Sequence, residues 1–214
     1  MPPTPLRLID TPNGESRATL LLAHGAGASM DTQFMNFVAK NLTISGWTII
    51  RFEFPYMAKR RATGIKAPPD RPKILQDHFI SEVSELDQSK PIIIGGKSMG
   101  GRIASLLVDQ LAIDVHVRAC ICLGYPFHPI GRPLKLRTEH LEALQTPTLI
   151  VQGERDPMGN LHEVQHYPIS DAIQFTWIKD GDHSFKPRKS SGLTEVGNLS
   201  MATEAVNSFL QSLL

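Results

Sequence analysis

Short apolar runs alternate along this chain with longer stretches in which apolar residues recur at helical spacing. Seven runs have the length and composition of strands; they cover residues 6–10, 18–23, 47–54, 91–95, 115–123, 146–153 and 173–178. The longer stretches predict helices near residues 31–46, 74–86, 99–111, 138–144 and 199–213. We expect Asp31 to cap the first of these helices. Most strand-like runs are apolar on both faces, which is typical of a parallel sheet covered by helices. We therefore predict an α/β fold with a mostly parallel central sheet, helices on both faces, and a single domain over residues 1–214.

Unusual loops follow five of these runs, at residues 24–27, 98, 125–129, 156 and 183. These positions are the carboxyl ends of predicted parallel strands. They should share one edge of the sheet, where open α/β sheets bind their ligands. We therefore expect the five loops to form one site.

Residues 55–72 carry five Lys or Arg residues and four prolines, and we predict a long connection there.

Ser98 follows a β-branched run directly, and a helical pattern begins at once after it. Gly96 and Gly100 flank it, which gives the G-x-S-x-G pattern of a nucleophile elbow. Such a turn presents the hydroxyl at a helix N-terminus, where backbone N–H groups favour developing negative charge. A plain glycine-rich turn or a phosphate-binding loop would give the same pattern. The strand before the serine and the helix after it favour the nucleophile.

A serine nucleophile needs a histidine base and an acid that orients it, in the order Ser, acid, His on this kind of fold. Asp156 and His183 satisfy that order downstream of Ser98. The alternatives are a turn-forming Asp-Pro at residue 156 and a surface histidine at residue 183. We expect Ser98, Asp156 and His183 to be catalytic, with the backbone N–H groups of Ala26 and Met99 as the oxyanion hole.

Two further histidine positions bear on the site. His128 lies in a loop on the predicted catalytic edge, where it either contacts substrate or packs the loop. His162 and His166 have the i, i+4 spacing of a zinc pair but lack the glutamate that the motif requires. We therefore expect no metal and no cofactor.

Composition limits the classes of function. The formal net charge of +1 gives no argument for nucleic acid or a membrane surface as partner. No apolar run reaches the roughly 18 residues of a membrane span, and the first residues do not resemble a signal peptide. Cys120 and Cys122 lie two apart in one strand-like run, a poor geometry for a disulfide, and we expect buried free thiols. These features favour a cytoplasmic protein.

Four motifs occur in a fixed order, at residues 24–27, 96–101, 153–157 and 182–184. With them the chain resembles the α/β-hydrolase superfamily over about residues 6–213. It looks most like a small, lid-poor branch that includes a testis-expressed hydrolase-like protein and a subunit of a nuclear histone-acetyltransferase complex. Residues 152–157 and 182–185 carry that likeness. The chain is also similar to dienelactone-hydrolase-like proteins, which commonly carry cysteine where this chain has Ser98.

We expect a serine hydrolase that acts on a small carboxylester or thioester through an acyl-enzyme on Ser98. The alternative is a non-catalytic binding or scaffold module that keeps the α/β-hydrolase fold. No long apolar insertion follows the run at 115–123, so we expect a minimal cap or none. The basic residues of 55–72 either recognise an anionic substrate or partner, or form a solvated loop.

Overall fold

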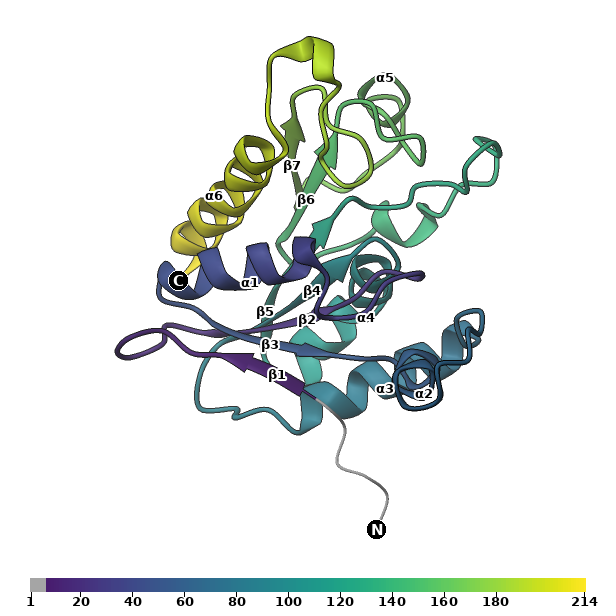
Figure 1. Cartoon of the computed structure of the whole chain (residues 1–214). Helices are drawn as coiled ribbons and strands as arrows, with labels where there is room; N and C mark the ends of the chain where they lie inside the picture. Colours follow the sequence, from purple (N-terminus) through teal and green to yellow (C-terminus); the bar gives the residue numbers. More distant parts are fainter. Residues whose placement is uncertain (1–6) are drawn as a thin grey trace.

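An open seven-stranded sheet forms the centre of the computed structural model, which describes residues 7–214 (Figure 1). The strands are β1 (Arg7–Asp10), β2 (Thr19–Ala23), β3 (Thr48–Phe52), β4 (Ile92–Lys97), β5 (Val117–Leu123), β6 (Thr148–Gly153) and β7 (Ile173–Ile178). Their order across the sheet is β1-β3-β2-β4-β5-β6-β7. Only β1 is antiparallel to its neighbour among these strands, so the predicted mostly parallel sheet is confirmed. The expected first strand began at Leu6, which lies outside the described residues.

Helices cover both faces of the sheet, as predicted (Figure 1). They are α1 (Gln33–Ile44), α2 (Pro55–Thr63), α3 (Pro72–Ser84), α4 (Met99–Asp114), α5 (Leu161–Val164) and α6 (Glu195–Leu213). α1 and α6 pack on one face, and α2, α3 and α4 pack on the other. No helix within residues 7–214 is long and apolar enough to cross a membrane.

The two apolar cores follow from the alternation of side chains along each strand. In β2, Leu20 and Leu22 face the α1 and α6 layer, while Leu21 and Ala23 face the α2, α3 and α4 layer. All four side chains are at most 1% exposed, so both faces of this strand are covered. This explains why the strand runs read as continuously apolar rather than alternating.

Two predictions about local elements were wrong, and a third was confirmed only in part. The long connection expected at 55–72 contains α2, which begins at Pro55 and buries Tyr56 and Met57. The cap of α1 is Thr32, whose Oγ accepts the Met35 N–H at 3.3 Å, and not the expected Asp31. The short helix expected near 138–144 is a single 3₁₀ turn, η1 (Glu139–Leu141).

Cys120 and Cys122 are free, buried thiols whose sulfur atoms lie 3.9 Å apart. Both point from β5 into the core beneath α4, where the Cys122 thiol contacts the Gly101 carbonyl at 3.3 Å. The prediction of buried free thiols is confirmed.

Candidate active site

Ser98 occupies the sharp turn between β4 and α4, with φ 52° and ψ −115°. A positive φ at a serine is strained by about 1–3 kcal/mol and persists only where the surroundings enforce it. The turn packs closely against the end of β2, since a Cβ on Gly100 would lie 2.5 Å from the Ala23 carbonyl oxygen and 2.7 Å from that of His24. Only glycine fits at Gly100, so the turn holds Ser98 at the N-terminus of α4.

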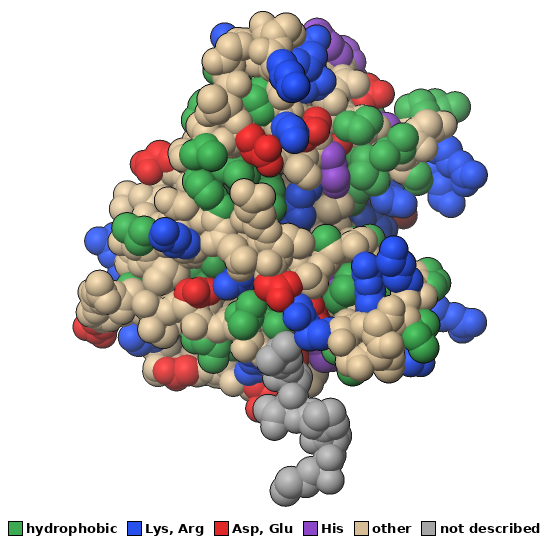
Figure 2. All heavy atoms as spheres, viewed as in Figure 1, with side chains coloured by type: hydrophobic (Ala, Val, Ile, Leu, Met, Phe, Trp, Pro, Cys, Tyr) green, Lys and Arg blue, Asp and Glu red, His purple; other side chains and the backbone are tan. Residues whose placement is uncertain are grey.

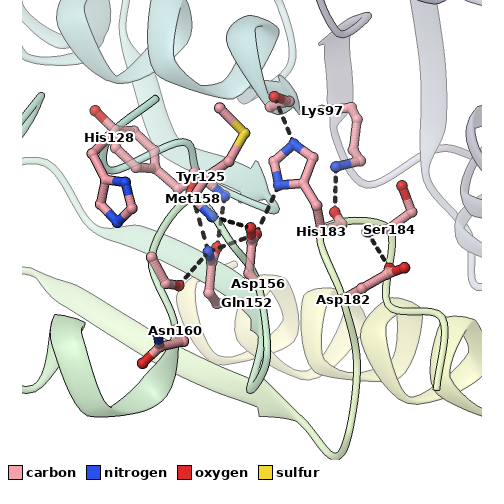
Figure 3. A network of polar contacts seen from close by, with 12 residues as sticks. Lys97, Tyr125, His128, Gln152, Asp156, Met158, Asn160, Asp182, His183 and Ser184 are labelled. Carbon is pink, nitrogen blue, oxygen red and sulfur yellow. Dashed lines mark hydrogen bonds and ion pairs between the residues drawn. The ribbon is translucent and has the colours of Figure 1, made fainter. Parts of the chain in front are cut away.

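His183 lies between Ser98 and Asp156 and contacts both. Figure 3 shows the contact between His183 and Asp156. Its Nε2 is 2.8 Å from the Ser98 hydroxyl oxygen, and its Nδ1 is 2.7 Å from Asp156 Oδ2. A carboxylate only accepts hydrogen bonds, so Nδ1 carries the proton and Nε2 is free to accept from the serine. The structure thus brings together three side chains that lie 58 and 27 residues apart in the sequence.

Gln152 holds the Asp156 carboxylate, a role that sequence reasoning missed (Figure 3). Its Nε2 donates to Asp156 Oδ2 at 2.9 Å and to the Gly159 carbonyl at 3.0 Å, while its Oε1 accepts the Tyr125 N–H at 2.7 Å. The Met158 N–H donates to the other carboxylate oxygen at 2.8 Å. Asp156 is fully buried, and these donors compensate the burial of its charge. The available signal was a glutamine inside an otherwise apolar strand.

Lys97, the residue before Ser98, holds the backbone of the loop that carries His183. Sequence reasoning missed this role as well. Its ammonium donates to the His183 carbonyl at 2.6 Å and lies 5.4 Å from the Phe34 ring centre. Burial lowers the pKa of Lys97 to about 8, although the negative charges of Asp156 and Asp182 oppose that shift. The lysine therefore fixes the backbone of His183 while its side chain stays away from solvent.

Ala26 and Met99 line one cavity of about 330 Å³ together with Ser98. Met99 is the first residue of α4, where a backbone N–H has no acceptor within the helix. Ala26 lies in the loop after β2, and the Tyr56 hydroxyl of α2 donates to its carbonyl at 2.8 Å. Both expected oxyanion donors thus lie on the wall beside the serine, and their role stays a prediction.

The ring of His24 shapes the loop that contains Ala26. It is fully buried, with Nδ1 donating to the Gly25 carbonyl at 2.7 Å and Nε2 accepting the Phe54 N–H at 3.1 Å. This arrangement needs a neutral imidazole, and burial lowers the pKa of His24. The loop is thereby fastened to the end of β3.

This arrangement of a strained serine, a histidine and a buried aspartate at the strand ends agrees with the family comparison. A family model of the alpha/beta hydrolase domain matches residues 16–211. The chain belongs to the alpha/beta hydrolase family. This membership confirms the resemblance drawn from the four motifs.

Individual relatives of this alpha/beta hydrolase are distant. A rat protein named "Putative protein-lysine deacylase ABHD14B" is 25% identical over 149 residues, which are 69% of this chain and 67% of the relative. The chain spans about two thirds of the length of the curated relatives that it matches.

Solved structures share the fold of this alpha/beta hydrolase. A dienelactone hydrolase from Anabaena variabilis matches with a TM-score of 0.72 and 18% identity, covering 97% of this chain and 91% of that one. An alpha-beta serine hydrolase homologue from Coxiella burnetii matches with a TM-score of 0.69, 20% identity and the same coverage. At these low sequence identities the matches show a shared fold and nothing about function.

His128 of this hydrolase packs inside its loop (Figure 3). The residue is 2% exposed, its Nδ1 lies 3.1 Å from the Pro129 carbonyl, and its Nε2 lies 3.4 Å from a carboxylate oxygen of Glu163. It does not line the cavity at Ser98. Of the two roles considered for His128, these contacts favour loop packing.

None of the basic residues of 55–72 lines the cavity at Ser98. Lys and Arg side chains do gather on the side of the molecule that carries α2 (Figure 2). Arg61 pairs with Glu53 at 2.7 Å and with Asp31 at 3.0 Å, and Arg60 donates to the Gly27 carbonyl at 3.3 Å. Arg60 and Arg61 therefore hold the loops around β2 and β3.

Within residues 7–214, no group of three His, Cys, Asp or Glu side chains could hold a metal ion.

Proposed function

We propose that this alpha/beta hydrolase is a serine hydrolase that cleaves a carboxylester or thioester through an acyl-enzyme on Ser98. The observation that carries the proposal is the hydrogen-bonded series Asp156, His183 and Ser98, with distances of 2.7 and 2.8 Å. The series ends at a cavity of about 330 Å³, large enough for a small ester.

The acylation step uses each group in one role. Ser98 Oγ attacks the carbonyl carbon while its proton passes to His183 Nε2, and Asp156 stabilises the resulting imidazolium. The N–H groups of Ala26 and Met99 bind the oxyanion, each typically contributing about 3 kcal/mol to lowering the barrier. The intermediate then loses the alcohol or thiol, which takes the proton from Nε2.

Deacylation reverses these roles with water. Water attacks the acyl carbon, its proton passes to His183 Nε2, and the acid leaves as the Ser98 hydroxyl regains that proton. The net reaction is ester plus water to acid plus alcohol. Gln152 and Lys97 act as positioning residues, because they hold Asp156 and the His183 backbone without reaching the cavity.

A fluorophosphonate probe tests the nucleophile directly. We expect intact-mass spectrometry to show one adduct on the wild-type protein, located on Ser98, and none on Ser98→Ala. Ser200→Ala, which removes an exposed serine of α6, should be labelled like wild type and is the matched control.

A substrate panel then tests the reaction class. It should contain 4-nitrophenyl esters, acyl thioesters and, because of the name of the rat relative, acyl-lysine peptides. We expect ester or thioester hydrolysis that disappears in Ser98→Ala. If the wild-type protein is neither labelled nor faster than Ser98→Ala on any member, the proposal fails and the non-catalytic module takes its place.

A further inference from the structure

Two arginines that pair with no carboxylate in the described part of the chain line the cavity that contains Ser98. Arg102 comes from the second turn of α4, one turn after the serine, and Arg137 comes from the loop between β5 and η1. Neither arginine forms a salt bridge with any carboxylate of residues 7–214. The Nε of Arg102 is buried, and it has no hydrogen-bond partner in the described part of the chain.

Other arginines that reach into this protein are paired. Arg7 lies 2.6 Å from the buried carboxylate of Glu82, and Arg61 lies 2.7 Å from the buried carboxylate of Glu53. The pairing follows the general rule that a desolvated charge is costly unless an opposite charge and hydrogen bonds compensate it. Arg102 and Arg137 are half-buried at the site where a substrate would bind, and within residues 7–214 neither has such a carboxylate partner.

The surroundings of the two arginines do not neutralise them. The carboxylate of Asp70 is on the same cavity wall, but it accepts the Tyr56 N–H at 3.0 Å and makes no salt bridge among the described residues. Burial and the charge of Arg102 lower the pKa of His140 to about 4, so that ring is neutral. Burial, and then the same charge, also lower the pKa of Arg137, which places the two cations within electrostatic reach.

We propose that Arg102 and Arg137 bind an anionic end of the substrate, a carboxylate or a phosphate, while the ester carbonyl lies at Ser98. Guanidinium groups match both oxyanions with paired N–H donors. Leu75 and Ile103 line the same cavity and suit a short methylene chain between the two polar ends. This substrate class rests on the proposed hydrolase function, and it assigns anion recognition to the cavity rather than to the basic segment 55–72.

Matched esters separate charge from shape. Mono-4-nitrophenyl glutarate and methyl 4-nitrophenyl glutarate share one acyl chain but differ in charge, and 4-nitrophenyl 4-phosphonobutanoate supplies the phosphate-like arm. We expect Arg102→Gln and Arg137→Gln each to lower kcat/KM for the preferred anionic ester by about 10-fold or more, as expected for one charge-assisted pair. The neutral ester should change by less than about 2-fold in the same variants, which also shows that they fold.

Three control variants test for general electrostatic effects. Arg132→Gln and Lys135→Gln remove exposed cations from the same loop as Arg137 but away from the cavity, and both should leave the two esters unaffected. Lys59→Gln with Lys66→Gln tests long-range attraction by the basic segment. Equal losses for charged and neutral esters in the cavity variants, or losses in the controls as large as in Arg102→Gln, would overturn the proposal.

A binding measurement separates this proposal from the hydrolase function. Monomethyl glutarate and methyl phosphate should each be tested for a rise in Tm of Ser98→Ala, with dimethyl glutarate as the neutral control. We expect at least one anion to stabilise Ser98→Ala, and Arg102→Gln in the same background to abolish the shift. If an anion raises the Tm of Ser98→Ala but the wild-type protein hydrolyses none of the esters, the anion site is retained and the hydrolase function is rejected. No shift with either anion, at concentrations that saturate typical small-molecule sites, would reject the anion site alone.

Discussion

The Asp156 carboxylate receives donors at both oxygens, and this makes Asp156→Asn a sharp test. Oδ1 accepts the Met158 N–H, while Oδ2 accepts from Gln152 and His183. An asparagine NH2 group must therefore face a donor in either orientation: the Met158 N–H in place of Oδ1, or the Gln152 amide in place of Oδ2. In the second orientation it also donates to His183 Nδ1 and moves the imidazole proton to Nε2. The wrong tautomer should lower kcat about 10⁴-fold. Steady-state kinetics on the preferred ester, together with a Tm measurement that confirms folding, provide the check.

Asp182→Asn is the matched control for that substitution. Asp182 is next to His183, but its Oδ1 only accepts the Ser184 and Lys186 N–H groups at 2.8 and 3.0 Å. Asparagine keeps such an oxygen, so activity should stay within about 3-fold of wild type. An Asp156→Asn enzyme with normal turnover, beside an inactive Asp182→Asn enzyme, would show that the acid had been misassigned.

Lys97 predicts a specific dependence of stability on pH. Its pKa is lowered from 10.5 to about 8 in the folded chain, so between these values the unfolded chain binds more protons. The lysine's contribution to the free energy of unfolding therefore rises with pH across this window, by at most about 3 kcal/mol. We expect the difference in unfolding free energy between wild type and Lys97→Met to grow in favour of wild type from pH 8 to 10. A flat difference in urea titrations would contradict the lowered pKa.

Sequence reasoning selected Ser98, Asp156 and His183 for the site because order along the chain and position at strand ends are visible in a sequence. It missed Gln152 and Lys97 because their partners come from other strands and loops. Lys97 meets His183 86 residues away, and Gln152 meets Tyr125 27 residues away. Such contacts depend on register and loop path, which a single sequence does not reveal. Arg102 was missed for a related reason, since only the structure shows that no carboxylate within residues 7–214 pairs with it.

At the scale of elements, the elbow depends on close contact between the start of α4 and the end of β2. Alanine usually stabilises a helix relative to glycine by up to about 1 kcal/mol. At Gly100 we expect alanine to destabilise the protein instead, because the added methyl would lie 2.5 Å from a backbone oxygen that cannot move freely. We expect Gly100→Ala to lower the free energy of unfolding by about 1–3 kcal/mol and to reduce activity. Chemical denaturation and ester kinetics measure the two effects.

Gly27→Ala provides the comparison for Gly100→Ala. A Cβ on Gly27 meets nothing within 4 Å, so its effect on stability should stay within about 0.5 kcal/mol. Equal stability of the Gly100 and Gly27 variants would mean that the elbow tolerates a side chain and is not sterically enforced.

The helix α2 shows where local patterns lose their predictive value. Its nine residues carry three Lys or Arg and only a short apolar face, so the basic, proline-containing stretch looked like a connection. Pro55 at the first helical position was a usable start signal, and Gly64 ends the helix in the left-handed conformation. What makes the segment helical is tertiary: Tyr56 and Met57 are buried against the core, which no local periodicity in nine residues can show.

At the scale of the whole molecule, the layers of the fold were predictable and the strand order was not. Apolar runs alternating with amphipathic stretches specify helices on both faces of a parallel sheet. The order β1-β3-β2-β4-β5-β6-β7 requires that the chain reverse direction across the sheet after β3, so that β4 pairs with β2. The carboxyl ends of β4, β6 and β7 then bring Ser98, Asp156 and His183 together.

We propose that the two cores, which share this one sheet, unfold together as a single domain, and the two tryptophans report on them separately. Trp47 is buried in the α1 and α6 core and donates to Asn207 at 2.9 Å, while Trp177 packs against the opposite core and stacks on Phe175. Trp177→Phe leaves fluorescence from the first core, and Trp47→Phe leaves it from the second.

In each single-tryptophan variant we expect the fluorescence transition in urea to coincide with the far-UV circular dichroism transition, as two-state unfolding requires. The comparison must be made within each variant, because Trp47→Phe leaves the buried Asn207 oxygen without its donor and should lower stability by about 1–3 kcal/mol. Both probes should also give the same m-value, since m scales with the surface exposed by one common unfolding event. A fluorescence midpoint displaced from the dichroism midpoint in either variant would show that one helical layer separates from the sheet before the other, and the chain would then not be one cooperative domain.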